Sequence, residues 1–183
     1  MYYARNVSVS AVVRTTPHLR AALDALAALD LPDAWIGAGA LRNAVWDVMH
    51  GRAPERPSDV DVVYFDPEDD GFQEHRIEAE LSRRAPAFVW EVRNQTRMHA
   101  RHGHAPYRCT AEAISYWVET ATAVAVRQIG TDRYEFLAPH GLGDLESLRL
   151  RAVSSDDRTT RALSERAARK RWVERWPLLS IES

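Results

Sequence analysis

The 183-residue chain has one cysteine, Cys109, and one lysine, Lys170. A single cysteine excludes an internal disulfide framework and a cysteine-rich zinc site, so we expect no disulfide partner and a reducing, cytoplasmic setting. No apolar run approaches the roughly 20 residues of a membrane-spanning helix, and we expect no membrane partner. The 24 basic and 26 acidic residues leave a net charge of −2, which predicts no bulk attraction to nucleic acid. We attribute the near absence of lysine to codon bias and assign Lys170 no function.

The chain has enough apolar material for a core, since 45% of its residues are hydrophobic and 27% are charged. Its length fits one domain, with a second small lobe as the upper limit. Residues 1–16 show no clear periodicity, and we interpret them as a variable N-terminal lead-in or an edge strand.

Hydrophobic periodicity and turn residues predict helices that alternate with strands. We expect strands over 34–37, 60–65, 87–92, 124–129 and 133–138. We expect helices over 17–31, 38–49, 67–84 with Asp66 as the N-cap, 110–117 and 157–176. Residues 50–58 hold two prolines and a glycine, which predict a loop. The alternation favours an α/β (α+β) domain with helices packed on a sheet.

Two aspartates begin the most strand-like segment, Ser58-Asp59-Val60-Asp61-Val62-Val63-Tyr64-Phe65. Residues i and i+2 of a strand point to the same face, so Asp59 and Asp61 project together. Two such carboxylates repel unless a cation lies between them, and Mg²⁺ prefers oxygen ligands. The alternative is that the aspartates only end a loop, where Asp is common.

A third acid and a glycine-containing turn strengthen the metal interpretation. Glu91 lies in the apolar strand Phe88-Val89-Trp90-Glu91-Val92, where an unpaired charge is costly. If this strand neighbours the aspartate strand, Glu91 can reach the same metal; the alternative is a salt bridge with Arg93 or Arg97. Gly37-Ala38-Gly39 joins a strand to a helix, where free amides and the helix dipole favour a phosphate, although glycine there can also serve geometry alone.

The order strand, glycine turn, helix, strand with Asp-x-Asp, helix, strand with a third acid resembles the DNA polymerase β-like nucleotidyltransferase superfamily. The similarity is greatest to a bacterial branch described as nucleotidyltransferase family proteins. It spans about residues 17–178 and is carried by the segments 38–47, 58–66, 90–99, 138–145 and 170–177. The resemblance implies a polymerase β-like core with a mixed sheet flanked by helices. It also implies a single domain over 17–178, with the catalytic core over about 17–100 and a small helical and strand extension over about 101–178.

The resemblance further implies a two-metal phosphoryl-transfer site that uses Mg²⁺ or Mn²⁺. By analogy, the metal-binding and catalytic residues are Asp59, Asp61 and Glu91. The nucleotide-binding residues are expected to be Gly37, Ala38, Gly39, Arg42 and Asn43, with a solvated helix arginine as the alternative for Arg42. Possible acceptor-side residues are Asn94, Gln95, Arg97 and His99, each of which could instead serve capping or packing. The superfamily often has serine at the turn, and with Ala38-Gly39 only backbone donors remain.

The expected activity is divalent-metal-dependent transfer of a nucleotidyl group from an NTP to a hydroxyl acceptor. The acceptor is a small molecule, RNA or protein, and the residues do not distinguish these. One alternative is a non-catalytic nucleotide- or RNA-binding module that retains the metal site. Another is a metal-assisted phosphohydrolase with the same three acids.

Overall fold

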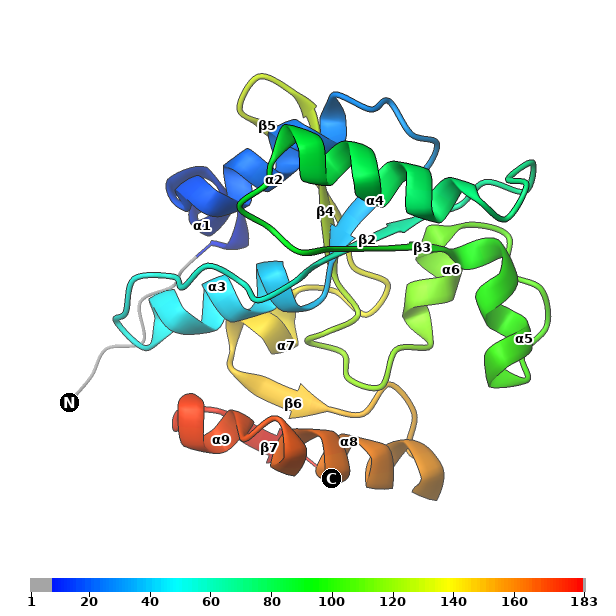
Figure 1. Ribbon diagram of the computed structural model, residues 1–183. Helices are drawn as coiled ribbons and strands as arrows, with labels where there is room; N and C mark the ends of the chain where they lie inside the picture. The colour runs from blue at the N-terminus through cyan, green and yellow to red at the C-terminus, as the bar shows by residue number, and fades with distance from the viewer. Residues whose placement is uncertain (1–7, 183) are drawn as a thin grey trace.

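A five-stranded mixed sheet forms the centre of the computed structural model, which describes residues 8–182 (Figure 1). Its strands lie in the order β3-β2-β1-β4-β5. β2 and β3 are parallel, and the other neighbouring pairs are antiparallel. The strand bounds are β1 Trp35–Gly37, β2 Val60–Tyr64, β3 Trp90–Asn94, β4 Ala125–Gly130 and β5 Arg133–Leu137. The predicted mixed sheet flanked by helices is confirmed.

Helices cover both faces of this sheet. The main core lies on the face of Val60, Val62 and Val92 and also takes in apolar residues of four helices. These helices are α1 Val9–Thr15, α2 Pro17–Ala27, α3 Gly39–Met49 and α4 Gln73–Arg84. On the opposite face a smaller cluster joins Trp35 and Val63 to Ile114. Val60 and Val62 therefore face one cluster and Val63 faces the other, as the alternation of side chains along a strand requires. The elements between β3 and β4 are the 3₁₀ turn η1 Gln95–Arg97, α5 Met98–His102 and α6 Thr110–Ser115.

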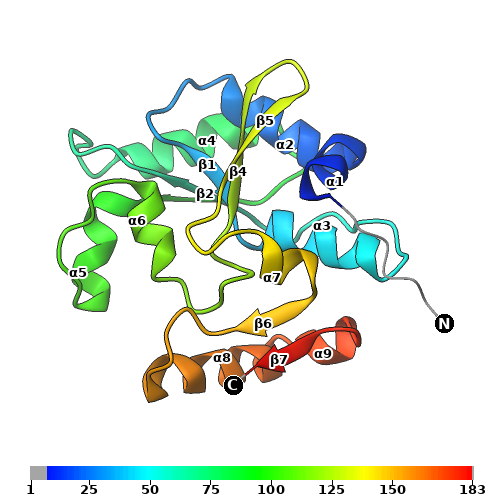
Figure 2. The ribbon, with the colours of Figure 1, turned by 180° about the vertical axis from the view of Figure 1, so that it is seen from behind.

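The C-terminal part of the chain forms a further layer, seen below the sheet in Figures 1 and 2. Its elements are α7 Gly143–Glu146, β6 Arg149–Arg151, α8 Asp157–Arg169, α9 Trp172–Arg175 and β7 Ser180–Glu182, with β6 and β7 paired in parallel. Trp172 and Trp176 are buried and meet Trp46 of α3 edge-on, with ring centroids 5.7 and 5.0 Å away. The predicted extension also supplies β4, which lies beside β1 in the central sheet.

The structure differs from the sequence prediction at the N-terminus. Residues 9–15 of the expected variable lead-in form the helix α1 and not an edge strand. Its short apolar face, Val9, Val12 and Val13, is buried in the main core. Two helical turns offer too few residues for the periodicity to stand out in the sequence. The rest of the predicted lead-in, residues 1–7, lies outside the described residues.

Two predicted elements have different bounds. The helix expected from residue 67 begins only at Gln73, because Asp66 accepts a hydrogen bond from the Glu68 amide in a turn and does not cap a helix. Asp69 likewise accepts from the Gly71 amide. The strand expected over 87–92 occupies 90–94, since pairing with β2 places Trp90 opposite Val60. Local turn chemistry and strand pairing therefore set these boundaries.

The predicted helix over 157–176 is interrupted. α8 ends at Arg169 with Lys170 as its C-cap, and Arg171 adopts a left-handed conformation with φ 52° and ψ 40° before α9 begins. A non-glycine residue in this conformation costs roughly 1–2 kcal/mol. Burial of Trp172 and Trp176 against α3 accompanies that conformation and stabilises the reversal.

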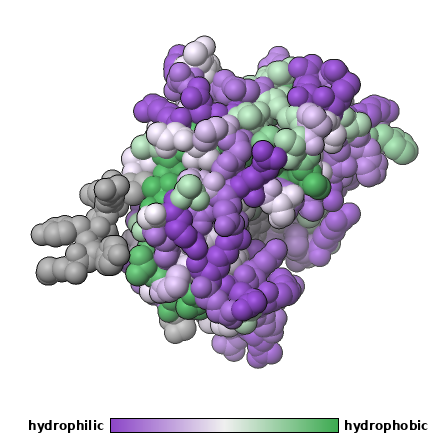
Figure 3. Space-filling view, turned by 60° about the vertical axis from the view of Figure 1, so that its left-hand side comes forward, coloured by the Kyte–Doolittle hydropathy of each residue, from purple (hydrophilic) through white to green (hydrophobic). Residues whose placement is uncertain are grey.

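No helix within the described residues is both long and apolar enough to cross a membrane. In the view of Figure 3 most of the surface is hydrophilic, and hydrophobic residues form separate patches. Among the large apolar residues that are exposed, Phe72 and Val89 have 66% and 63% of their surface accessible to solvent. Scattered exposed residues of this kind are normal for a folded domain.

Candidate active site

The structure brings together the three predicted metal-binding acids. Asp61 of β2 lies opposite Glu91 of the parallel neighbour β3, and Asp59 precedes Asp61 by two residues on the same face. One carboxylate oxygen from each residue lies within 4.8 Å of the others. Three carboxylates this close offer the hard oxygen donors that Mg²⁺ and Mn²⁺ take.

No ion pair with the residues that the structure describes neutralises the charges of this cluster. Among residues 8–182, no basic side chain lies within 4.0 Å of these three carboxylates, and the Ser58 hydroxyl donates to Asp59. Burial, and next the negative charges of Asp59 and Glu91, raise the pKa of Asp61 to about 6. A group that resists ionisation in this way is stabilised by a cation bound beside it.

The alternative salt bridge predicted for Glu91 is not formed. Arg93 pairs with Glu78 at 3.1 Å. Arg97 lies 3.5 Å from Asp69 and 3.7 Å from Glu74. Both arginines therefore contact acids away from the cluster, and the Glu91 side chain is exposed beside Asp61.

The predicted phosphate turn lies next to the acids. Ile36 pairs with Val62, so the end of β1 at Gly37 lies beside Asp61. Ala38 has a positive φ, with φ 43° and ψ −117°, and its amide donates to the Val124 carbonyl at 3.2 Å. Among the described residues, no side chain caps the N-terminus of α3. Its first-turn amides and its dipole are therefore available to an anion.

The two glycines of this turn have different surroundings. A Cβ on Gly37 would lie only 2.8 Å from Cη2 of Trp117, so this glycine is explained by close packing. A Cβ on Gly39 would lie 3.9 Å from Asn43 Nδ2 and 4.0 Å from Arg42 Nη2, an ordinary contact. Gly39 thus lies beside two side-chain donors, whereas Gly37 lies under an indole.

Arg42 is buried, and the alternative of a solvated helix arginine is wrong. Its Nη1 donates to Thr122 Oγ1 at 2.8 Å, and its Nη2 donates to Asn43 Oδ1 at 2.9 Å. The guanidinium lies over the rings of Trp46 and Trp172, at 4.8 and 4.6 Å from their centroids. Burial lowers the pKa of Arg42 to about 10, and the carboxylates of Glu119 and Asp61 oppose this shift.

The four possible acceptor-side residues follow β3 and have structural partners. Asn94 is buried, and its Nδ2 donates to Asp69 Oδ2 at 2.8 Å while its Oδ1 accepts from the Thr96 amide. Gln95 donates to a backbone carbonyl. His99 Nδ1 lies 2.8 Å from the Thr96 carbonyl, and Arg97 is held by the ion pairs described above. These contacts stabilise the end of β3, and a role toward an acceptor stays a prediction.

Sequence reasoning missed the segment 117–124, which contacts several parts of the site. Besides the contacts of Trp117, Thr122 and Val124 already described, the fully buried Glu119 accepts from Arg166 Nε of α8 at 2.6 Å. The partners lie 47 to 86 residues away in the sequence. A buried glutamate among small and apolar residues, Val118-Glu119-Thr120-Ala121, is the one signal that could have indicated this segment.

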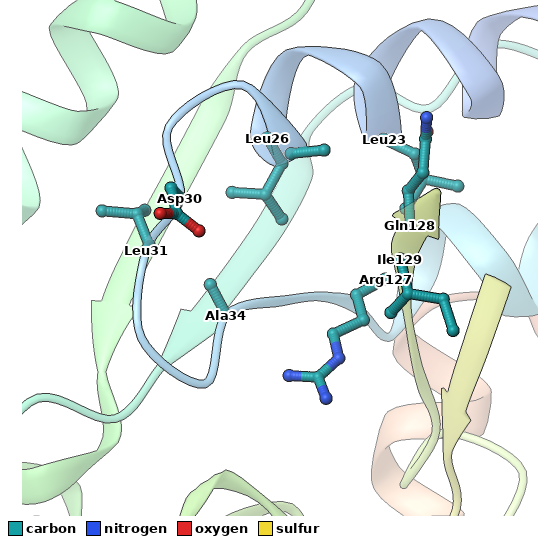
Figure 4. A pocket seen from close by; sticks show the side chains of 9 residues that line it. Leu23, Leu26, Asp30, Leu31, Ala34, Arg127, Gln128 and Ile129 are labelled. Carbon is teal, nitrogen blue, oxygen red and sulfur yellow. The ribbon is translucent and has the colours of Figure 1, made fainter. Parts of the chain in front are cut away.

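A cavity with a volume of about 180 Å³ lies away from the three acids, between α2 and the end of β4 (Figure 4). Leu23 and Leu26 line it from one side, and Arg127 and Ile129 line it from the other. Ala34, which precedes β1, also lines it, whereas the phosphate turn follows β1. None of the predicted site residues lines this cavity, so it does not belong to the carboxylate site.

Comparisons with known proteins agree with this arrangement. A nucleotidyltransferase family model matches residues 24–181. A solved NMR structure described as revealing a CCA-adding enzyme head domain has a TM-score of 0.84 at 27% identity, covering 97% of this chain and 97% of that chain. A structure described as a tRNA-processing enzyme complex has a TM-score of 0.53 at 18% identity, covers 88% of this chain and 43% of that one, and shows a similar fold alone. A search of curated proteins found no match. The nucleotidyltransferase resemblance inferred from the motifs is confirmed.

Proposed function

Because the chain belongs to a family of nucleotidyltransferases, we propose that it transfers a nucleotidyl group from an NTP to a hydroxyl acceptor. The observation that carries this proposal is the cluster of Asp59, Asp61 and Glu91. Their carboxylate oxygens lie within 4.8 Å of one another, and no ion pair with the described residues neutralises them. In the reaction the acceptor oxygen bonds to the α-phosphorus, pyrophosphate departs with the bridging oxygen, and the hydroxyl proton passes to solvent.

The three acids fit Mg²⁺ or Mn²⁺ as the cofactor, since all the donors are carboxylate oxygens. Bound divalent cations supply charge neutralisation for the triphosphate and lower the pKa of the acceptor hydroxyl. Asp59 and Asp61, two residues apart at the start of β2, would hold the cations. Glu91 would contribute the third ligand from the neighbouring strand and, by analogy with the superfamily, would hold the cation nearer the attacking oxygen.

The N-terminus of α3 is proposed to hold the β- and γ-phosphates. Gly39 lets a phosphate approach the first-turn amides, and Asn43 Nδ2 lies close to the same position. Arg42 is held beside this turn by its hydrogen bonds to Thr122 and Asn43. Its guanidinium is buried, and its positive charge would favour a phosphate bound at the turn. Gly37 and Ala38 set the backbone path into the helix.

A thermal-shift experiment tests the binding half of the proposal. ATP, GTP, CTP and UTP are each added with Mg²⁺ or Mn²⁺ to the wild type and to the Asp59→Asn/Asp61→Asn double variant. Ligand at about 100 times its Kd adds about 2.7 kcal/mol, which raises the Tm by roughly 5–10 °C for a chain of this size. We expect a metal-dependent rise in the wild type that the double variant lacks.

Product analysis then separates the proposed reaction from the two alternatives. A nucleotidyltransferase releases pyrophosphate only with an acceptor, and acceptor pools of RNA, protein and small hydroxyl compounds identify its class. A phosphohydrolase releases phosphate or a nucleoside monophosphate without an acceptor. A binding module shows the thermal shift and no product with any pool, a result that would contradict the proposed activity.

A further inference from the structure

We propose that Lys170, the single lysine of the chain, binds the β- and γ-phosphates of the NTP from the turn between α8 and α9. This inference deepens the proposed function and rests on it. It assigns to the C-terminal layer a direct contact with substrate.

The backbone at Lys170 is fixed between two anchors that reach the site. Four residues earlier, Arg166 pairs with the buried Glu119 at 2.6 Å, and its carbonyl accepts from the Lys170 amide at 2.9 Å. Two residues later, Trp172 lies under the Arg42 guanidinium, 4.6 Å from the ring centroid to Cζ. Arg42 Nη2 in turn lies next to Gly39 at the phosphate turn. The α8–α9 turn is therefore a neighbour of the predicted phosphate position.

The left-handed conformation of Arg171 reverses the chain at this point. Because Trp172 turns into the core after it, the preceding residue is left at the surface, and the Lys170 side chain is exposed. Within residues 8–182 no carboxylate lies within 4.0 Å of its ammonium, although many of the nearby arginines have such partners. Lys170 is thus a cation that forms no ion pair with the described residues, and it directly precedes a strained turn residue.

The site needs such a cation because Arg42 is already engaged. Its Nε, Nη1 and Nη2 all donate to side chains of the protein, so it acts on a phosphate through its field more than through free donors. A triphosphate brings several negative charges next to three carboxylates. An ammonium on a flexible stem can contact terminal phosphate oxygens as a point charge.

The single lysine permits a direct test by amine-selective acylation. The wild type is treated with a succinimidyl ester in the presence of inorganic tripolyphosphate, ATP or AMP, each with Mn²⁺, and acylation of the Lys170 peptide is measured by mass spectrometry. The N-terminal amine serves as the internal reference. At about ten times the Kd, tripolyphosphate and ATP should slow acylation of Lys170 about tenfold, and AMP should protect far less. Thermal shift in the same samples reports whether the ligand is bound.

The outcomes distinguish this inference from the proposed function. If ATP with Mn²⁺ raises the Tm but Lys170 is acylated at the unliganded rate, the inference is wrong and the proposed function stands. If neither the Tm nor the acylation rate responds to any triphosphate, the proposed function fails and the inference fails with it.

Variants provide a second test with a matched control. Lys170→Met should weaken the binding of tripolyphosphate and of ATP by about tenfold, as loss of a hydrogen bond to a charged group does. Lys170→Arg should recover part of this loss because it retains the charge. Arg169→Met removes an exposed cation one residue away and should leave both affinities unchanged. Equal weakening by Arg169→Met and Lys170→Met would show a general loss of positive charge and would overturn the specific contact.

Discussion

Two aspartates beside the same pair of parallel strands have opposite environments. Asp69 accepts from the Tyr64 hydroxyl at 2.5 Å, from Asn94 Nδ2 at 2.8 Å and from the Gly71 amide at 2.7 Å. Although burial opposes its ionisation, these donors lower the pKa of Asp69 to about 2. Asp61 faces Glu91 and Asp59 instead, and burial with these like charges raises its pKa to about 6.

The difference separates a carboxylate with a structural role from one that we propose binds a cation. The protein itself satisfies Asp69, so its charge stabilises the corner where β2 ends. Nothing among the described residues pairs with Asp61, so its charge destabilises the free protein unless a cation binds. Neutralising Asp61 should therefore lower activity and raise the stability of the metal-free protein, whereas neutralising Asp69 should lower stability and leave the activity of the folded protein unchanged.

The largest expected effect is on catalysis. Asp61→Asn should reduce acceptor-dependent pyrophosphate release by on the order of a thousandfold, because it removes a ligand from the charge-stabilising centre. Asp69→Asn should reduce it by no more than the folded fraction falls. Initial rates at saturating NTP, corrected for folded protein by circular dichroism, check the comparison. Equal losses in the two variants would contradict the separation of roles.

Stability should respond in the reverse order. Asp69→Asn leaves a buried network without its charge and should cost about 2–4 kcal/mol, or roughly 4–16 °C in Tm. Thermal unfolding by circular dichroism in a chelating buffer measures this loss. A Tm within 1 °C of the wild type, a difference well below that expected range, would show that the Tyr64–Asp69–Asn94 contacts contribute little.

Asp61→Asn should stabilise the metal-free protein at neutral pH. Its folded pKa is about 6, above the ordinary value of 3.8, so the stability of the wild type should fall as pH rises between these values. Asp61→Asn removes that dependence and should gain about 1–2 kcal/mol at pH 7.5, or roughly 2–8 °C, with little gain near pH 4. Unfolding curves of both proteins from pH 4 to 8 test the sign. A gain at pH 4 equal to that at pH 7.5 would exclude the ionisation of Asp61 as its cause.

The smallest expected effect is on the pKa of Asp61, to which the charge of Asp59 is the second-largest contribution after burial. Asp59→Asn removes one neighbouring charge and should lower the pKa of Asp61 toward its ordinary value, while burial and Glu91 continue to raise it. Carboxyl-carbon NMR titration of the metal-free protein reports this change. Asp70→Asn, an exposed acid paired with Arg76, is a suitable control and should leave the Asp61 titration unchanged.

The acids could be predicted from sequence because their arrangement follows from local rules. Asp59 and Asp61 share a face by strand periodicity, and Glu91 reaches them because consecutive strands joined by a helix pair in parallel. The burial of Arg42 could not be predicted, since Thr122 and Trp172 are distant in sequence. The role proposed for Lys170 could not be predicted from the sequence either. Its rarity is attributed to composition alone, and the interruption of the predicted helix at Arg171, from which the inference about Lys170 starts, could not be seen in the sequence.

Direct measurement of Mn²⁺ binding by electron paramagnetic resonance tests the central claim, that the carboxylate of Asp61 is a ligand of a divalent cation. Free Mn²⁺ is titrated against the wild type, Asp61→Asn and Asp69→Asn, each confirmed to be folded at the temperature used. The account predicts that Asp61→Asn weakens Mn²⁺ binding by at least about tenfold and that Asp69→Asn leaves it unchanged. Equal affinity in the wild type and Asp61→Asn would contradict it.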